Sequence, residues 1–504
     1  MLKLKKKDNT MRSKIFLLST AIASLLFASC EKFEEMNENP NEPTVVSADV
    51  LLASSQRQSV TTLTEESFLL GNNAAQITAK TLRTEIDAYN WNAFPTVWEG
   101  LYNSLTDLKS MENIAVSNGN EKMQGVARVM RAYIYSVLTN AYGDIPYSQA
   151  IQGDENNFTP VYDSQEAIYA DLFVELEQSV ALLNGQGEIS GDLIYGDNAD
   201  QWVRFTNSLR LRLLMTANAK IPDVAQRFSD VVATGNIMQS NSDNAVLNFL
   251  VGFPNQFPLI PQKTGDFDAV ALSSNMYNAL SSTEDPRIAR YARPSDDDYD
   301  SIDVATDFSG AVNGSNSANC SKSGSRLGPQ YYNYPQLTTA QSLGIDMANG
   351  VMMTYAEVCF LLAEAAEKGW IGNDVETEYR NGIQASMEYH QVDLAPFQWS
   401  DFNDFYTNSG VAWNNNAMQI WEQKWIALFF HGLQPYFEVR RWYVESGNSF
   451  DQIPFLTTPC EDLNGGNLPM RFIYPGEEIS LNASNEAGAA ENLTDENSRM
   501  WLVQ

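Results

Sequence analysis

The clearest shortage in this sequence is histidine, which occurs only twice in 504 residues, as His390 and His431. Two isolated histidines make no HExxH zinc pair. The sequence also contains no GxSxG nucleophile elbow and no glycine-rich phosphate loop. We therefore expect no catalytic residue, no metal and no cofactor. His431 lies near the end of an aromatic helical pattern, where a core or capping role is expected.

Cysteine is also scarce, with four in the chain. None belongs to a CxxC motif or to a metal-like cluster. Cys359 lies in an apolar helical pattern and is expected to be a small core residue. Cys320 and Cys460 remain as a candidate disulfide, which the sequence alone does not decide.

Basic residues are outnumbered, with 32 lysines and arginines against 63 aspartates and glutamates, so the formal net charge is −31. A negative field of that size repels nucleic acids and anionic lipid head groups. The charge therefore favours neutral or cationic ligands and predicts no nucleic-acid partner.

Long apolar runs are missing as well. The longest, residues 15–27, falls short of the roughly 20 residues that a membrane-spanning helix needs. It follows a lysine-rich start and ends at Phe27-Ala28-Ser29-Cys30, which resembles a bacterial lipobox with Phe27 in place of the usual leucine. We predict a lipoprotein signal peptide over residues 1–29, acylation of Cys30, a polar tether over residues 30–44 and a single ligand-binding domain over residues 45–504. An ordinary signal peptide with an incidental cysteine is the alternative.

Apolar residues at helical spacing are abundant beyond the tether. The pattern predicts helices over residues 123–142, 165–183, 202–217, 354–368 and 418–432. Poorly periodic stretches, residues 249–274 and 294–335, separate them and are long enough to suggest function. The sequence thus predicts a mainly α domain with long irregular loops and little β structure. Trp98 and Tyr102, one helical turn apart, and the aromatic residues of 429–443 are assigned to the core.

Two stretches alternate aromatic rings with amides, a combination that suits sugars. Rings stack on the C–H faces of a pyranose, and amides bond its hydroxyl groups. The candidate ligand contacts are Tyr89, Trp91 and Asn92 in one stretch and Tyr331, Tyr332, Asn333 and Tyr334 in the other. Core packing is the competing interpretation, because sequence does not reveal exposure.

Two acidic features allow a chemical interpretation. Glu357 and Glu364 share one helical face and could act as a glycosidase pair. In so acidic a chain we instead expect them to pair with arginines such as Arg440 and Arg441. The acidic run of residues 296–300, with Asp303, could hold calcium, but it lacks the glycine and glutamate of an EF-hand and is expected to be a solvated charge run.

Several stretches, in order along the chain, resemble the SusD/RagB family of nutrient-binding outer-membrane lipoproteins. They are residues 37–41, 141–147, 202–212, 285–287, 353–357, 362–366, 379–387, 423–428 and 438–441. The resemblance implies a superhelix of tetratricopeptide-like helix pairs at the outer face of the outer membrane. It also implies a partner, a SusC-like TonB-dependent β-barrel transporter over which the protein sits as a lid.

The function that the resemblance implies is capture of a glycan or another nutrient oligomer and its delivery to the transporter. Three alternatives stay open at this point. They are a peptide-binding member of the same family, a surface glycoside hydrolase, and a structural lipoprotein without a ligand pocket.

Overall fold

The computed structural model describes residues 46–250, 252–253, 255–315, 320–332, 344, 346–490 and 493–504. Cys30 and the predicted signal peptide and tether lie outside these residues. Ala48–Gln504 form one compact unit. Within the described ranges, no helix combines the length and apolar character needed to cross a bilayer.

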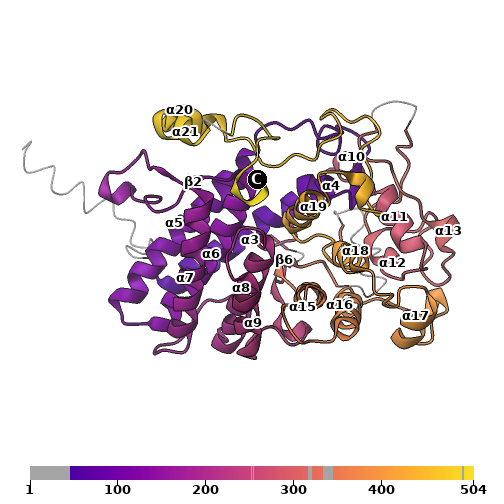
Figure 1. The fold of residues 1–504 in the computed structure, drawn as a ribbon, viewed down its shortest axis with the longest axis horizontal. Helices are drawn as coiled ribbons and strands as arrows, with labels where there is room; N and C mark the ends of the chain where they lie inside the picture. Colours follow the sequence, from indigo (N-terminus) through magenta and orange to yellow (C-terminus); the bar gives the residue numbers. More distant parts are fainter. Residues whose placement is uncertain are drawn as a thin grey trace, which may run out of the picture. The chain divides into compact units, whose positions relative to one another are not determined.

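The first half of the unit is a stack of helices. Its members are α3 (Ala48–Glu66), α4 (Asn72–Ala74), α5 (Pro95–Ser117), α6 (Glu121–Tyr142), α7 (Gln165–Leu183), α8 (Ala199–Thr216) and α9 (Val224–Ala233). A π-helical turn, η1 (Ser67–Gly71), continues α3. Neighbours pack in pairs, α3 with α5 and α6 with α7, and α5 also packs on α6 (Figure 1). This arrangement is the expected tetratricopeptide-like core.

The second half adds short helices and then a further bundle. The short helices are α10 (Thr264–Phe267), α11 (Ser274–Ser281), α12 (Ile288–Tyr291) and α13 (Val304–Asp307). The bundle and the C-terminal part comprise α15 (Tyr355–Glu367), α16 (Val375–Tyr389), α17 (Phe402–Asn408), α18 (Ala417–Ala427), α19 (Gln434–Glu445), α20 (Gly476–Leu481) and α21 (Ala483–Ala490). Here α15 packs on α16 and on α18 (Figure 1).

The strands described form three antiparallel pairs, and isolated β-bridges occur outside them. The pairs are β1 (Thr78–Lys80) with β5 (Val270–Leu272), β2 (Ile145–Pro146) with β3 (Tyr162–Asp163), and β4 (Ala245–Leu247) with β6 (Gly350–Met353). Short 3₁₀ turns are η2 (Gly153–Glu155), η3 (Asn241–Asp243), η4 (Ala395–Phe397), η5 (Phe450–Gln452) and η6 (Trp501–Val503). The mainly α prediction is confirmed.

Local signals place most helix ends where the periodicity predicts them. The Asn120 side chain accepts a hydrogen bond from Met123 N at the start of α6, and Ser164 does the same for Ala167 N at the start of α7. Gly143 ends α6 with φ of 88°, a value that glycine adopts without strain. Helix α7 matches its predicted range.

One predicted helix ends early. The pattern extends to Gly432, but α18 stops at Ala427. The chain then turns, with φ of 65° at Phe430 and 61° at Gly432. Phe429 and Phe430 after the helix are buried in the core, so apolar residues continue in the sequence past the last helical residue. The apolar pattern alone therefore overestimates the length of the helix.

Buried ion pairs connect the helices, and one of them joins the two halves. Arg212 on α8 donates to both carboxylate oxygens of Glu357 on α15, each at 2.6 Å. Arg441 on α19 holds Glu364 at 2.7 and 2.8 Å. The expected arginine pairing is therefore confirmed, with one correction. Arg440 binds the carbonyl oxygens of Asn140 and Met470 instead of a carboxylate.

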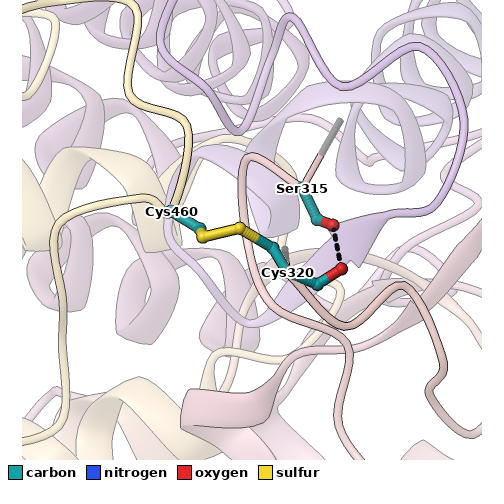
Figure 2. The surroundings of a disulfide bond; sticks show 3 residues. All are labelled: Ser315, Cys320 and Cys460. Atoms are coloured by element: carbon teal, nitrogen blue, oxygen red, sulfur yellow. Dashed lines mark hydrogen bonds between the residues drawn. A yellow bond between two sulfur atoms is a disulfide. The ribbon is translucent and has the colours of Figure 1, made fainter. Parts of the chain in front are cut away.

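The two candidate cysteines form a disulfide. Cys320 and Cys460, 140 residues apart in sequence, are bonded to each other, with their Cα atoms 6.4 Å apart (Figure 2). The Ser315 hydroxyl donates to the Cys320 carbonyl at 2.8 Å, and Cys460 N donates to the Asn313 carbonyl at 2.9 Å. The bond ties the segment after α13 to the segment after α19. Cys359 is free and fully buried, as expected of a core residue.

The aromatic core also follows expectation. The rings of residues 429–443 that were assigned to it (Phe429, Phe430, Tyr436, Phe437, Trp442 and Tyr443) are all buried. Trp98 is buried on α5, and the half-buried Tyr102 donates its hydroxyl to the Pro146 carbonyl at 2.7 Å.

Candidate ligand-binding site

A cavity of about 450 Å³ lies where three loop segments meet the end of α16. We call it the tyrosine pocket, after Tyr331, Tyr332 and Tyr389 in its wall. Its described lining also includes Asn248, Phe249, Leu250, Gln330, Asp346, Met347, Ala348, Asn349, His390 and Gln391. Its volume falls in the range typical of small-molecule sites.

Strand pairing brings two of these segments together. In the antiparallel pair, Leu247 of β4 lies opposite Gly350 of β6. Residues after β4 and residues before β6 therefore leave the ladder at the same end. Ala348 N donates to the Gln330 carbonyl at 3.0 Å, which attaches the third segment. The pocket thus depends on residues that are far apart in sequence.

The aromatic wall is anchored on the core. The Tyr331 ring lies 4.2 Å from Phe430 and 5.2 Å from Phe429 between centroids. Tyr331 and Tyr332 are buried, and burial raises the pKa of both phenols. Tyr389 is half-buried and meets the His390 ring edge-on at 4.8 Å. The rings are therefore held in place by their own packing.

Amides and one imidazole supply the hydrogen-bonding groups. Gln330 Nε2 donates to His390 Nδ1 at 3.0 Å. Burial lowers the pKa of His390 well below 6.5, so its ring is neutral and carries its proton on Nε2. Among the described residues Nε2 has no partner. Gln391 Nε2 donates to Asp346 Oδ2 at 2.6 Å.

The described wall carries almost no charge. Asp346 is its single charged side chain, and its other polar groups are amides, phenols and the neutral His390. A surface of this kind offers donors and acceptors to hydroxyl groups and no cation to an anionic group. It matches the chemistry of a neutral polar ligand that presents C–H faces.

A second cavity, of about 500 Å³, shares residues 248–250 with the tyrosine pocket. We call it the leucine pocket, because Leu193, Leu247 and Leu250 contribute to its wall. Helix α3 supplies most of the remaining lining through Ser54, Arg57, Gln58, Thr61 and Thr62, with Asn255 and Gln256 at the far side. Asn248, Phe249 and Leu250 line both cavities.

Tyr331 and Tyr332, of the candidate contacts read from the sequence, line the tyrosine pocket. Asn333 and Tyr334 lie outside the described residues. Asn92 is exposed and is not part of this lining.

Tyr89 and Trp91 require a correction, because the structure places both in the core. The Tyr89 ring is fully buried and its hydroxyl donates to the Ala74 carbonyl at 3.2 Å. Trp91 packs against Phe94, Tyr436 and Phe472, and its indole N–H donates to the Ile86 carbonyl at 2.8 Å. Neighbouring rings cover the faces that a sugar would need, so both are packing residues here.

Sequence reasoning missed Asn248, Tyr389, His390 and Gln391. The signal for the first was weak, since the poorly periodic stretch from residue 249 begins beside it. The other three lie at or just after the end of α16. Polar and aromatic residues at a helix terminus are usually interpreted as capping residues. No local pattern distinguishes the two roles.

The residues considered for catalysis are committed to other partners. Glu357 and Glu364 are held by Arg212 and Arg441 in the buried pairs described above. His431 is buried, which lowers its pKa to about 4, and its ring nitrogens contact the Phe429 carbonyl and the Thr354 hydroxyl. The expected core role of His431 is confirmed.

The acidic run lies at the surface. Asp296, Asp297, Asp298 and Asp300 are exposed, and the amides of Asp298 and Asp300 bond the carboxylates two residues before them. Asp303 caps α13 by accepting from Ala305 N. Within the described residues, no group of three or more side chains is arranged to hold a metal ion.

Comparison with known proteins places the chain among outer-membrane binding proteins. The SusD-like family model, described as "Starch-binding associating with outer membrane", matches residues 40–475. An outer membrane protein from Bacteroides vulgatus that is linked to nutrient binding is 25% identical, with a TM-score of 0.76 over 91% of this chain and 100% of its own.

Two further solved structures share the fold. A SusD homolog from Bacteroides fragilis is 24% identical, with a TM-score of 0.71 over 89% of this chain and 100% of its own. A chitin-binding SusD homolog from Flavobacterium johnsoniae is 21% identical, with a TM-score of 0.69 over 90% and 98%. Among curated proteins, none matches the chain.

Proposed function

This chain belongs to the SusD-like family of starch-binding proteins associated with the outer membrane, and from that membership we propose that it captures neutral oligosaccharides at the cell surface. It passes them to a SusC-like TonB-dependent β-barrel transporter. It binds its ligand without chemical turnover. Acylated Cys30 holds the protein on the outer membrane.

The observation that carries the proposal is the tyrosine pocket. Tyr389, which is half-buried, offers ring surface, and Tyr332 lies in the same wall at 3% exposure. Gln330, Asn349 and Gln391 offer amides in that wall. Aromatic side chains and a few placed polar groups are the usual makeup of a small-molecule site. The single carboxylate of Asp346 supports a neutral ligand over a polyanionic one.

Absence of turnover is supported by how the candidate acids are used. A glycosidase needs one carboxyl free to donate a proton and a second that is open to the substrate. Glu357 and Glu364 instead form bidentate contacts with buried arginines. Release of shorter sugars from a polysaccharide by the pure protein would contradict this part of the proposal.

The binding experiment is calorimetric titration of the mature chain with maltohexaose and with chitohexaose. We expect saturable binding of at least one of them. Tyr332→Ala and Tyr389→Ala should each weaken it by about 1–3 kcal/mol, by analogy with the loss of a stacked base. Tyr389 is half-buried, so Tyr389→Ala removes little of the core. This variant therefore still tests the pocket if Tyr332→Ala fails to fold.

The matched control is Phe158→Ala, which removes a 72% exposed ring from outside the tyrosine pocket. It should leave the affinity unchanged. Equal loss in all three variants, or no binding of either sugar by the unmodified chain, would count against the assignment of the pocket. Affinity purification from detergent-solubilised outer membranes tests the transporter, and we expect a large β-barrel protein to be recovered with the chain.

A further inference from the structure

The two pockets share one wall, which is the starting point for an inference that rests on the proposed function. Asn248, Phe249 and Leu250 line both the tyrosine pocket and the leucine pocket. We propose that the leucine pocket is a second subsite, which receives the far end of the same oligosaccharide that occupies the tyrosine pocket.

The shared wall combines one buried and two exposed side chains. Phe249 is buried and packs edge-on against Phe257, with 5.7 Å between ring centroids. Asn248 is exposed beside it, and Leu250 is 57% exposed. The shared wall therefore offers one amide and one aliphatic side chain to a ligand that spans both pockets.

Hydrogen bonds attach Leu250 of the shared wall to residues 255–257. Leu250 N donates to the Asn255 carbonyl at 2.7 Å, and Phe257 N donates to the Leu250 carbonyl at 3.1 Å. Arg57 on α3 donates from Nη1 to Asn255 Oδ1 at 3.1 Å. Because Leu250 is held by these bonds before binding, it needs little further ordering when a ligand spans both pockets.

The lining of the leucine pocket combines apolar and hydrogen-bonding groups, which match the C–H faces and the hydroxyl groups of a sugar. Leu193, which is 42% exposed, and Leu247 provide apolar surface for C–H groups. Gln58 and Thr61 on α3 provide an amide and a hydroxyl for hydrogen bonding. Each pocket has the volume of a separate small-molecule site, so the pair fits an oligomer better than a single sugar.

When an oligomer binds at both pockets, the second contact is intramolecular, so it adds affinity without a second loss of translational and rotational entropy. Affinity should therefore increase with chain length beyond the length that fills the tyrosine pocket. A ligand confined to the tyrosine pocket would reach its full affinity at short length.

The test compares oligomers of two to six sugars, in the maltose and the chitobiose series, by calorimetric titration. The Ser54→Trp variant places a large ring in the leucine pocket from an exposed position on α3. Leu193→Asn removes apolar surface from the same cavity, at a residue between α7 and α8. Val50→Trp, one turn earlier on α3 and 54% exposed, is the matched control outside the pocket lining.

We expect Ser54→Trp and Leu193→Asn to keep the affinity for the shortest oligomer that binds. For the hexamer they should lose roughly tenfold, which corresponds to about 1.4 kcal/mol. Val50→Trp should follow the unmodified chain at every length. A hexamer advantage that survives both pocket variants overturns the second subsite while leaving the proposed function standing.

The opposite failure is distinguishable. If the unmodified chain binds no oligomer of either series at any length, the proposed function itself fails, and the second subsite fails with it. Loss of the shortest oligomer together with the hexamer in Ser54→Trp would also overturn the proposal, because the two pockets would then not be separable subsites.

Discussion

At the scale of single residues, the most consequential feature is charge buried between helices. Arg212 and Glu357 are each no more than 5% exposed at the side chain, and Lys424 and Glu438 are no more than 1% exposed. Burial alone opposes ionisation of Glu438, but the charges of Lys424 and Arg441 outweigh it and lower its pKa to about 2. Each of these ions depends on its partner.

Removing one partner should therefore be severe. Glu357→Gln leaves Arg212 without its carboxylate in a dry interior, and we expect the free energy of unfolding to fall by about 3–5 kcal/mol. Urea unfolding followed by circular dichroism measures the change. Glu155→Gln, which removes an exposed partner of Lys109, is the control and should change little. Similar stability in all three proteins would refute the role of the buried pair.

A second prediction concerns pH and Glu66, a carboxyl group whose pKa is raised by burial. Burial, with a smaller contribution from Glu65, raises the pKa of Glu66 from 4.5 to about 7. The unfolded chain releases this proton near pH 4.5, whereas the folded chain retains it to about pH 7. The free energy of unfolding therefore falls as the pH rises from about 4.5 to about 7, because over this range the folded chain keeps a proton that the unfolded chain has released. Above pH 7 the loss is complete.

Glu66→Gln removes the ionisation. At pH 8 the variant should be more stable than the unmodified chain by on the order of 3 kcal/mol, and at pH 4 the difference should nearly vanish. Thermal unfolding across pH 4–8 measures both limits. Glu188→Gln, at an exposed site, should show no such pH-dependent gain. A constant difference at all pH values would point to packing instead of ionisation.

At the scale of elements, helix packing depends on a close approach between two glycines. Gly71 ends the turn η1 in helical geometry, and a Cβ on it would overlap the Gly432 carbonyl oxygen. Alanine usually stabilises a helical position relative to glycine. Here alanine is expected to destabilise the protein, because its Cβ would overlap a backbone peptide group, which cannot move aside as a flexible side chain can.

We therefore predict that Gly71→Ala lowers the free energy of unfolding by about 1–3 kcal/mol, as overpacking does. Gly372→Ala is the matched control, since a Cβ there meets no atom within 4 Å. Chemical denaturation of both variants tests the comparison. Equal free energies of unfolding for the two variants would contradict the prediction, because they would show that the segments around Gly71 and Gly432 can move apart without loss of stability.

At the scale of the whole molecule, the question is what retains the protein at the membrane. The described residues include no helix that could span a bilayer. Acyl chains on Cys30 would supply an anchor, since each buried CH₂ contributes about 0.8 kcal/mol. Family membership indicates association with the outer membrane. The acyl anchor that we propose at Cys30 would give that association a mechanism.

Cys30→Ala should leave the body folded and move it from the membrane fraction to the soluble fraction. Cell fractionation with mass spectrometry of the N-terminal peptide measures both location and acylation. Cys359→Ala, which removes the buried free thiol, should stay with the membrane. Membrane retention of the Cys30→Ala protein would refute the anchor.

The sequence by itself determined five of the helices, four of them to within three residues at each end. Periodicity and caps are local, so α7 could be assigned from residue 165 to residue 183, and the arginine partner of Glu364 could be anticipated. Only tertiary structure decided where α18 ends and which aromatic rings are covered. Tyr332 and Trp91 occur in similar local patterns, yet one lines a cavity and the other packs on Phe472.

The pocket itself is a product of distant contacts. Asn248 and Asn349 come together because β4 pairs with β6, and His390 joins them because α16 ends beside Tyr331. Such pairings arise from the free energy of burying the whole core. A window of neighbouring residues contains no information about that sum.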